Sequence, residues 1–136
     1  MNIARLGIIG YGTMGSGIAT VALINGLRVK VLESAEKQLA RGNQVIQKSI
    51  AKLIEKNKVS GSVEEHMSRL ETVSSLEQLK DCELVVEAVS ENKELKLGIF
   101  EALDRLMPPG VILASKTSSF SITELGSRTG RPDRVV

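Results

Sequence analysis

The chain has 136 residues, of which 42% are hydrophobic and 25% charged, and its formal net charge is +2. These values suit one globular domain with a buried core, and the charge is too small to indicate a nucleic-acid binder. The single cysteine, Cys82, excludes an internal disulfide and any cysteine-rich zinc site; we expect it to be a small buried filler and expect no metal site. No apolar run is long enough for a membrane span, and residues 1–10 enter a strand without a signal or transit peptide. We therefore expect a cytoplasmic protein.

Segments with the patterns of strands and of helices alternate along the chain. This alternation favours an α/β domain with a doubly wound, mostly parallel sheet. Strands are expected at residues 3–10, 27–33, 71–75, 82–90 and 111–115, and residues 134–136 have the pattern of a further strand. Helices are expected at residues 13–26, 35–57, 92–107 and 122–129. Capping boxes are predicted at Ser62 with Glu65 and at Ser121 with Glu124, and the first of these opens a short helix. The segment between the second and third strands is thus a long helical excursion.

A glycine-rich motif joins the first strand to the first helix. The stretch GYGTMGSG has the spacing G-x-G-x-x-G, with glycines at positions 10, 12 and 15. Gly10 permits the tight turn, Gly12 lets a pyrophosphate approach the backbone, and Gly15 lets the helix pack closely on the sheet. The free N–H groups at the start of the helix then hold the anion. A loop that serves packing alone is the structural alternative.

An acidic residue follows at about the 20-residue offset that dinucleotide-binding motifs show. Glu33 ends the second predicted strand. A carboxylate there accepts hydrogen bonds from the ribose hydroxyls and repels a 2′-phosphate. The motif and its acid together predict dinucleotide binding, with NAD favoured over NADP.

Five stretches, taken together and in order, are similar to one protein family: GYGTMGSGIA, VVEAVSENKELK, IFEALD, ILASKTSSFSITEL and TGRPDRVV. They resemble the N-terminal NAD-binding domain of 3-hydroxyacyl-CoA dehydrogenases, including the 3-hydroxybutyryl-CoA type, over nearly the whole chain. The resemblance implies a Rossmann-like NAD-binding domain at residues 1–136. It also implies NAD-dependent oxidation of an L-3-hydroxyacyl-CoA to a 3-ketoacyl-CoA, or the reverse reaction, in fatty-acid or butyrate metabolism.

The resemblance further implies roles for individual residues. Ser118 corresponds to the serine that hydrogen-bonds the reacting 3-oxygen of the substrate beside the nicotinamide. Ser49 and Lys56, on the long helix and its continuation, correspond to positions that contact coenzyme A. The positions that match cofactor-binding residues of the family are Gly10, Tyr11, Gly12, Thr13, Met14, Gly15, Glu33, Glu91, Lys96 and Ser118.

The chain departs from the family pattern in two ways. Lys116 stands where the family usually has asparagine, and lysine only donates hydrogen bonds, so the hydrogen bonding on the cofactor side is left open. The family's catalytic histidine lies in a Gly-x-His-Phe-Phe-Asn-Pro segment that would follow Val136, and a helical domain comes after it. That domain completes the acyl pocket and forms the homodimer in the family. We expect this chain to lack both and to have little or no turnover alone.

Several residues have a structural interpretation beside a functional one. His66, the only histidine, is in a polar segment and is expected to be solvated or to cap a helix, not to be the base. Lysines 48, 52 and 56 fall at i, i+4 and i+8, which predicts either a solvated face or a contact for coenzyme A phosphates. Glu87, in the apolar run LVVEAV, must lie at a rim or have a partner, because an unpaired buried charge is costly.

Two rival functions remain. Another β-hydroxyacid dehydrogenase, of the hydroxyisobutyrate or phosphogluconate type, would share the glycine loop, although the stretches VVEAVSEN and TSS speak against it. A non-catalytic relative, as in the lens crystallins of this family, would keep the fold without turnover. The favoured partner is an acyl-CoA substrate, with no nucleic acid and no membrane.

Overall fold

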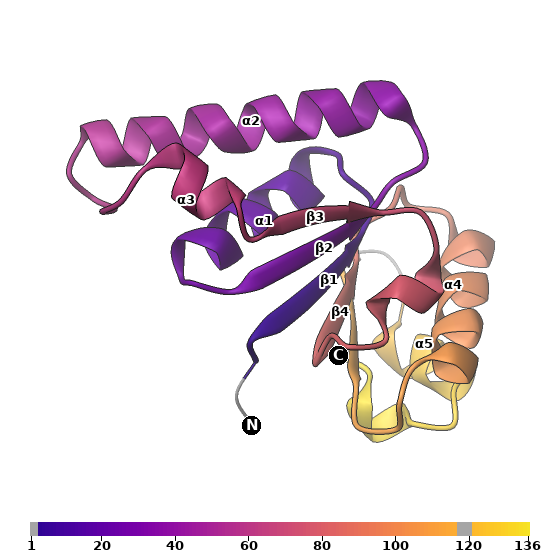
Figure 1. Cartoon of the computed structure of the whole chain (residues 1–136). Helices are drawn as coiled ribbons and strands as arrows, with labels where there is room; N and C mark the ends of the chain where they lie inside the picture. Colours follow the sequence, from indigo (N-terminus) through magenta and orange to yellow (C-terminus); the bar gives the residue numbers. More distant parts are fainter. Residues whose placement is uncertain (1–2, 117–120) are drawn as a thin grey trace.

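The computed structural model describes residues 3–116 and 121–136, whose strands form a single sheet (Figure 1). The strands are β1 (Arg5–Ile9), β2 (Arg28–Leu32), β3 (Leu70–Val73), β4 (Leu84–Glu87) and β5 (Ile112–Ser115). Their order is β3-β2-β1-β4-β5, and every neighbouring pair is parallel. The predicted doubly wound, Rossmann-like sheet is therefore confirmed, and its described strands are all parallel rather than mostly so.

Helices cover the sheet on both sides. They are α1 (Thr13–Ile24), α2 (Glu36–Glu55), α3 (Val63–Met67), α4 (Lys93–Leu106) and α5 (Ile122–Ser127), with 3-10 turns η1 (Leu76–Leu79) and η2 (Pro132–Arg134). In Figure 1, α1 and α2 lie on one side of the sheet and α4 and α5 on the other. Right-handed crossovers that leave the centre of the sheet in opposite directions require this arrangement. The predicted helical excursion after the second strand is α2 and α3.

Aliphatic side chains form a core on each face of the sheet, as the low aromatic content predicts. The core under α1 and α2 contains Ile8, Leu23, Val31, Ile46 and Ile50, all fully buried. The core under α4 and α5 contains Leu79, Val85, Phe100, Leu103 and Leu113, also fully buried. Because both faces carry apolar side chains, the central strands have continuous hydrophobic runs instead of alternating ones.

The element ends differ from the predicted ones by a few residues, which is normal for fraying termini. The N–H groups of Glu65 and Glu124 donate to the Ser62 and Ser121 hydroxyls at 3.1 and 3.2 Å, so the serine half of each predicted capping box is present. The predicted further strand at 134–136 is represented by a parallel bridge between Val135 and Leu113. Among the described residues, no helix is both long enough and apolar enough to cross a bilayer.

The prediction that His66 is solvated or a helix cap is wrong. Its side chain is buried, because α3 packs with one side against α1 and α2 while its glutamates face water. His66 Nε2 lies 2.8 Å from the carbonyl oxygen of Ser60, and Nδ1 lies 2.9 Å from a guanidinium nitrogen of Arg69. Both ring nitrogens therefore serve the packing of α3.

Candidate functional site

The carboxyl ends of β1 and β4 form the switch point of the sheet, where ligands bind in open α/β folds. Gly10 leaves β1 here with a φ of +100°, and a Cβ atom on it would lie 2.8 Å from the carbonyl oxygen of Ala88. No side chain fits, because the loops that leave β1 and β4 touch at this point. The Gly10 N–H also donates to the Leu32 carbonyl at 2.9 Å, which ties the loop to β2.

The other two glycines of the motif differ in their surroundings. A Cβ atom on Gly15 would collide with the carbonyl oxygen of Gly10, so α1 begins pressed against the loop. A Cβ atom on Gly12 would have nothing within 4 Å. The steric roles predicted for Gly10 and Gly15 are thus confirmed. Gly12 leaves an open approach to the backbone, and its contact with a pyrophosphate stays a prediction.

The N-terminus of α1 is prepared for an anion. Its N-cap, Gly12, offers no side-chain hydrogen bond, and the first turn holds no acidic residue. The N–H groups of a helix start need acceptors, and the helix dipole there favours negative charge. An anionic group over Gly12 would satisfy both conditions.

Glu33 lies directly beside this loop. One carboxylate oxygen accepts a hydrogen bond from the Tyr11 N–H at 3.1 Å, and the other accepts from the Ala35 N–H at 3.2 Å. The acid is therefore oriented by two backbone groups at the end of β2. This is the place at which the sequence motif expects a ribose.

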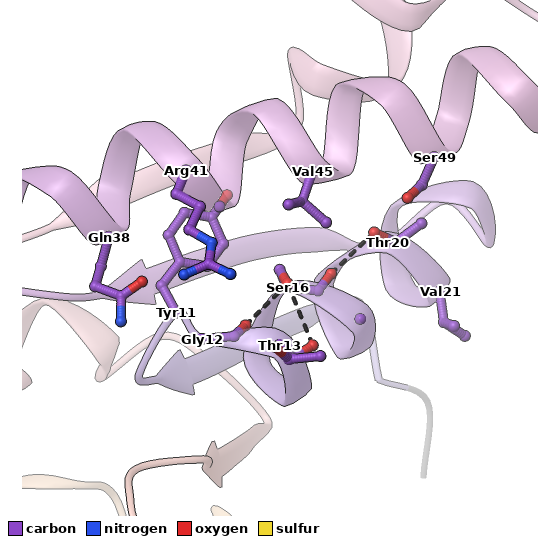
Figure 2. Close-up of a pocket in the computed structure, with 12 residues that line it drawn as sticks. Tyr11, Gly12, Thr13, Ser16, Thr20, Val21, Gln38, Arg41, Val45 and Ser49 are labelled. Carbon is purple, nitrogen blue, oxygen red and sulfur yellow. Dashed lines mark hydrogen bonds between the residues drawn. The ribbon is translucent and has the colours of Figure 1, made fainter.

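A groove of about 380 Å³ extends from the loop between α1 and α2 (Figure 2). Ser49 of α2 and Thr20 of α1 point toward each other across it, and Arg41 and Gln38 reach from α2 toward the loop (Figure 2). Its lining also includes Tyr11, Gly12, Thr13, Ser16, Gly17, Val21, Gly42 and Val45. The structure thus brings Ser49 into one cavity with the glycine motif.

The groove contains residues that the sequence interpretation missed. Arg41, Val45 and Ser49 follow one another at intervals of four, so a helical stripe drawn through Ser49 would have found Arg41. Lys56 is the C-cap of α2 and lies outside the groove lining. It is exposed, as are Lys48 and Lys52, so the stripe of lysines faces water in this structure.

Tyr11 contributes to the site through its backbone and through packing. Its ring is buried under Gly42, where a Cβ atom would lie 2.6 Å from the ring, and its hydroxyl donates to the Asn43 side chain at 2.7 Å. Burial raises the pKa of this phenol far above its ordinary value. The side chain therefore anchors α2 over the glycine loop, and only the N–H faces Glu33.

A buried ion pair lies on the other side of the switch point. Glu87, at the end of β4, and Lys96, on α4, are both fully buried, and the ammonium lies 2.6 Å from the carboxylate. The prediction that Glu87 has a partner is confirmed. The same ammonium lies 3.2 Å from the carboxylate of Glu91, so the structure brings together the two residues predicted to approach the cofactor after β4.

The remaining predicted positions lie in different surroundings. Met14 is an exposed residue in the first turn of α1, and Lys116 is exposed while its N–H donates to the Glu87 carbonyl at 2.9 Å. Ser118 lies outside the described residues. Cys82 is a buried filler as predicted, and burial raises the pKa of its thiol to about 12. Within residues 3–116 and 121–136, no cluster of three histidine, cysteine or acidic side chains could hold a metal.

Comparison with known proteins extends these observations. Among curated proteins, the chain is 42% identical over 132 residues to a probable 3-hydroxybutyryl-CoA dehydrogenase of Deinococcus radiodurans, covering 97% of this chain and 48% of that protein. It is 36% identical to a probable 3-hydroxybutyryl-CoA dehydrogenase of Bacillus subtilis, covering 100% of this chain and 48% of that protein. The chain therefore spans about half the length of the curated relatives it matches.

Solved structures match equally well. A structure of FadB2 from M. tuberculosis superposes with a TM-score of 0.91 at 38% identity, covering 99% of this chain and 48% of that one. The (S)-3-hydroxybutyryl-CoA dehydrogenase PaaH1 from Ralstonia eutropha gives a TM-score of 0.91 at 36% identity, with 98% and 48% covered. The sequence profile described as "3-hydroxyacyl-CoA dehydrogenase, NAD binding domain" matches residues 5–136. The chain belongs to this family, the NAD-binding domains of 3-hydroxyacyl-CoA dehydrogenases.

Proposed function

We propose that this chain is the cofactor-binding part of an enzyme that oxidises L-3-hydroxyacyl-CoA to 3-ketoacyl-CoA with NAD, or runs the reverse reaction. One observation carries the proposal. The open backbone at Gly12 and the uncapped start of α1 lie at the switch point, with Glu33 oriented beside them. Membership of the family and the names of the relatives support the same reaction.

The residues present fit NAD. The backbone of residues 10–15 would hold the pyrophosphate and Glu33 the adenosine ribose, while a 2′-phosphate would meet the negative charge of Glu33. Bound NAD supplies the nicotinamide ring that accepts the hydride from C3. Glu91 and Lys96 are assigned to the cofactor side of the crevice, and Ser118 to the 3-oxygen of the substrate.

The proton of the substrate hydroxyl needs a base. The only histidine of the chain, His66, has both ring nitrogens engaged, by Ser60 and by Arg69. We therefore assign the general base to a part of the protein outside these residues. The homodimer and the cytoplasmic location stay predictions.

The groove between α1 and α2 is the proposed binding site for the coenzyme A part of the substrate. Ser49 lies in the groove that starts at the glycine loop, and Arg41 adds a guanidinium to the same groove. A guanidinium binds phosphate groups well, because it offers several charged donors in one plane. Lys56, further along α2, is assigned to the same ligand.

The test uses the intact protein that contains this chain. NADH consumption is followed with acetoacetyl-CoA, and the affinities for NADH and NADPH are measured by titration. We expect turnover and a clear preference for NADH. Binding of NADH without reduction of acetoacetyl-CoA would overturn the substrate assignment, and activity on hydroxyisobutyrate or phosphogluconate would then favour the rival dehydrogenases.

A further inference from the structure

The carboxylate of Glu87 is the centre of a hydrogen-bond network that joins the ends of two strands. Its Oε1 accepts a hydrogen bond from the Ser115 hydroxyl, the last residue of β5, at 2.6 Å. Its Oε2 accepts from the Val89 N–H at 2.8 Å and from the Lys96 ammonium at 2.6 Å. The two oxygens thus serve different strands, because Oε1 fixes the chain leaving β5 and Oε2 fixes the chain leaving β4.

Lys96 is fully occupied by this network. Its ammonium has three N–H donors, and three acceptors surround it: Glu87 at 2.6 Å, Glu91 at 3.2 Å and the Val89 carbonyl at 3.3 Å. The side chain is fully buried. In this structure Lys96 therefore acts as the counter-ion of Glu87 and as a clamp on the loop between β4 and α4.

That loop forms one wall of the switch point. The carbonyl oxygen of Ala88 faces Gly10 so closely that no Cβ atom fits, and the Ala88 N–H donates to the Ile9 carbonyl at 2.8 Å. A shift of residues 88–91 would therefore move the loop against the glycine motif. On the β5 side, the Lys116 N–H donates to the Glu87 carbonyl at 2.9 Å, and Ser118 follows two residues later in the sequence.

A buried ion pair is by itself weak evidence for a role in stability. Burying two charges is costly, and well-packed apolar residues often stabilise a core as well or better. We propose that Glu87 is a positioning residue for the cofactor crevice, holding the β4 exit loop through Val89 and Lys96 and the β5 exit through Ser115. The inference rests on the proposed function and adds to it a division of labour. The contacts of Glu87 Oε2 with Val89 and Lys96, which we call the Lys96 branch, set cofactor affinity. The contact of Glu87 Oε1 with the Ser115 hydroxyl, which we call the Ser115 branch, sets turnover.

The two branches are tested separately in the intact protein, by NADH titration, steady-state kinetics with acetoacetyl-CoA, and urea unfolding. Ser115→Ala is expected to lower kcat about tenfold with the NADH Kd within about twofold of the parent, and Ser115→Thr to restore most of kcat. Ser127→Ala is the matched control, because that hydroxyl also donates at 2.6 Å but to a carbonyl of α5. An equal loss of kcat in Ser127→Ala, or none in Ser115→Ala, would overturn the Ser115 branch.

The Lys96 branch must be tested with a variant that still folds. Glu87→Gln alone leaves Lys96 buried and uncompensated. Lys96 is also assigned to the cofactor side, so a loss of NADH affinity counts for Glu87 only where Glu87→Gln shows it as well. The double variant Glu87→Gln/Lys96→Met buries no charge. We expect it to unfold at a urea concentration near that of the parent and to bind NADH about tenfold more weakly. A double variant that is folded and binds NADH like the parent would overturn the proposal. A parent that binds NADH but turns over no acetoacetyl-CoA would instead overturn the proposed function, and the NADH titrations would still decide the positioning role of Glu87.

Discussion

The carboxylate of Glu33 accepts a hydrogen bond from the backbone N–H of Tyr11 at 3.1 Å, so the end of β2 is joined directly to the glycine loop after β1. A second backbone group, the Ala35 N–H, holds the other oxygen at 3.2 Å. Such charge-assisted hydrogen bonds fix the acid before any ligand arrives. The acid that is predicted to bind the ribose and the loop that is predicted to hold the pyrophosphate are thus joined directly.

Replacing this acid should change cofactor choice more than stability. Glu33→Gln keeps one acceptor oxygen but removes the negative charge that repels a 2′-phosphate. We expect the Kd for NADH to rise about tenfold and the preference over NADPH to shrink by a similar factor, as measured by fluorescence titration. Glu36→Gln, an exposed acid in the first turn of α2, is the control. If both variants lose NADH affinity equally, the loss comes from the removal of one negative charge near the site and not from a contact that Glu33 makes.

Substitutions at two glycines of the motif, Gly12 and Gly10, should have different effects on NADH affinity and on stability. Gly12→Ala adds a methyl group in open space, so NADH affinity should fall at least about tenfold while the free energy of unfolding changes by about 0.5 kcal/mol or less. Gly10→Ala must adopt a φ of +100° and meet Ala88, which should cost about 2–4 kcal/mol of stability. Urea unfolding and NADH titration check both. Equal destabilisation by the two substitutions would contradict the assignment.

The contact between Gly42 and Tyr11 should make an alanine on α2 unfavourable. A Cβ atom at position 42 would lie 2.6 Å from the Tyr11 ring, which is 1% exposed and has buried neighbours around it. We expect Gly42→Ala to destabilise by about 1–3 kcal/mol in urea unfolding, despite the better helix propensity of alanine. Gly98→Ala on α4, with nothing within 4 Å, should instead stabilise by about 1 kcal/mol. If Gly42→Ala stabilised the protein as Gly98→Ala does, the Tyr11 ring would have to move aside for the added methyl group.

Arg131 should be irreplaceable by lysine. Its guanidinium donates to the Asp104 carboxylate at 2.9 Å and to four backbone carbonyls at distances from 2.6 to 3.3 Å, those of residues 104, 107, 108 and 111. These carbonyls lie at and just beyond the end of α4, and a lysine has too few donors to serve them. We expect Arg131→Lys to cost about 2–4 kcal/mol of unfolding free energy. Arg128→Lys, an exposed partner of Glu101, should change it by less than about 0.5 kcal/mol.

The buried thiol of Cys82 should make the protein less stable in alkali. Burial raises its pKa to about 12, above that of an unfolded cysteine, so between these two values the folded state binds more protons than the unfolded state. The free energy of unfolding therefore falls as pH rises above about 8.5, by up to about 1.4 kcal/mol per unit from this group. Cys82→Ala should flatten this part of the stability–pH profile. An unchanged slope would assign it to other groups, such as Tyr11, whose pKa burial also raises.

Much of the site could be predicted because its signals are local. The glycine spacing, the acid at the end of the second strand and the capping serines each depend on backbone geometry within a few residues. Gly10 and Gly15 have their predicted steric roles, and each of the five strands overlaps a predicted strand. The burial of His66 could not be predicted from the sequence, because it follows from the packing of α3 against α1 and α2.

The sequence by itself determined the succession of strands and helices along the chain, the doubly wound class and the dinucleotide-binding loop. Hydrophobic periodicity and glycine spacing depend only on residues close together in the sequence. Only the tertiary structure decided which partners the charged residues take. Glu87 and Lys96 are nine positions apart, and Ser115 is 28 positions from Glu87. They meet because parallel strands β4 and β5 end side by side and α4 returns across them. In the low dielectric of that buried edge, the carboxylate needs these partners, and no local pattern reveals where they come from.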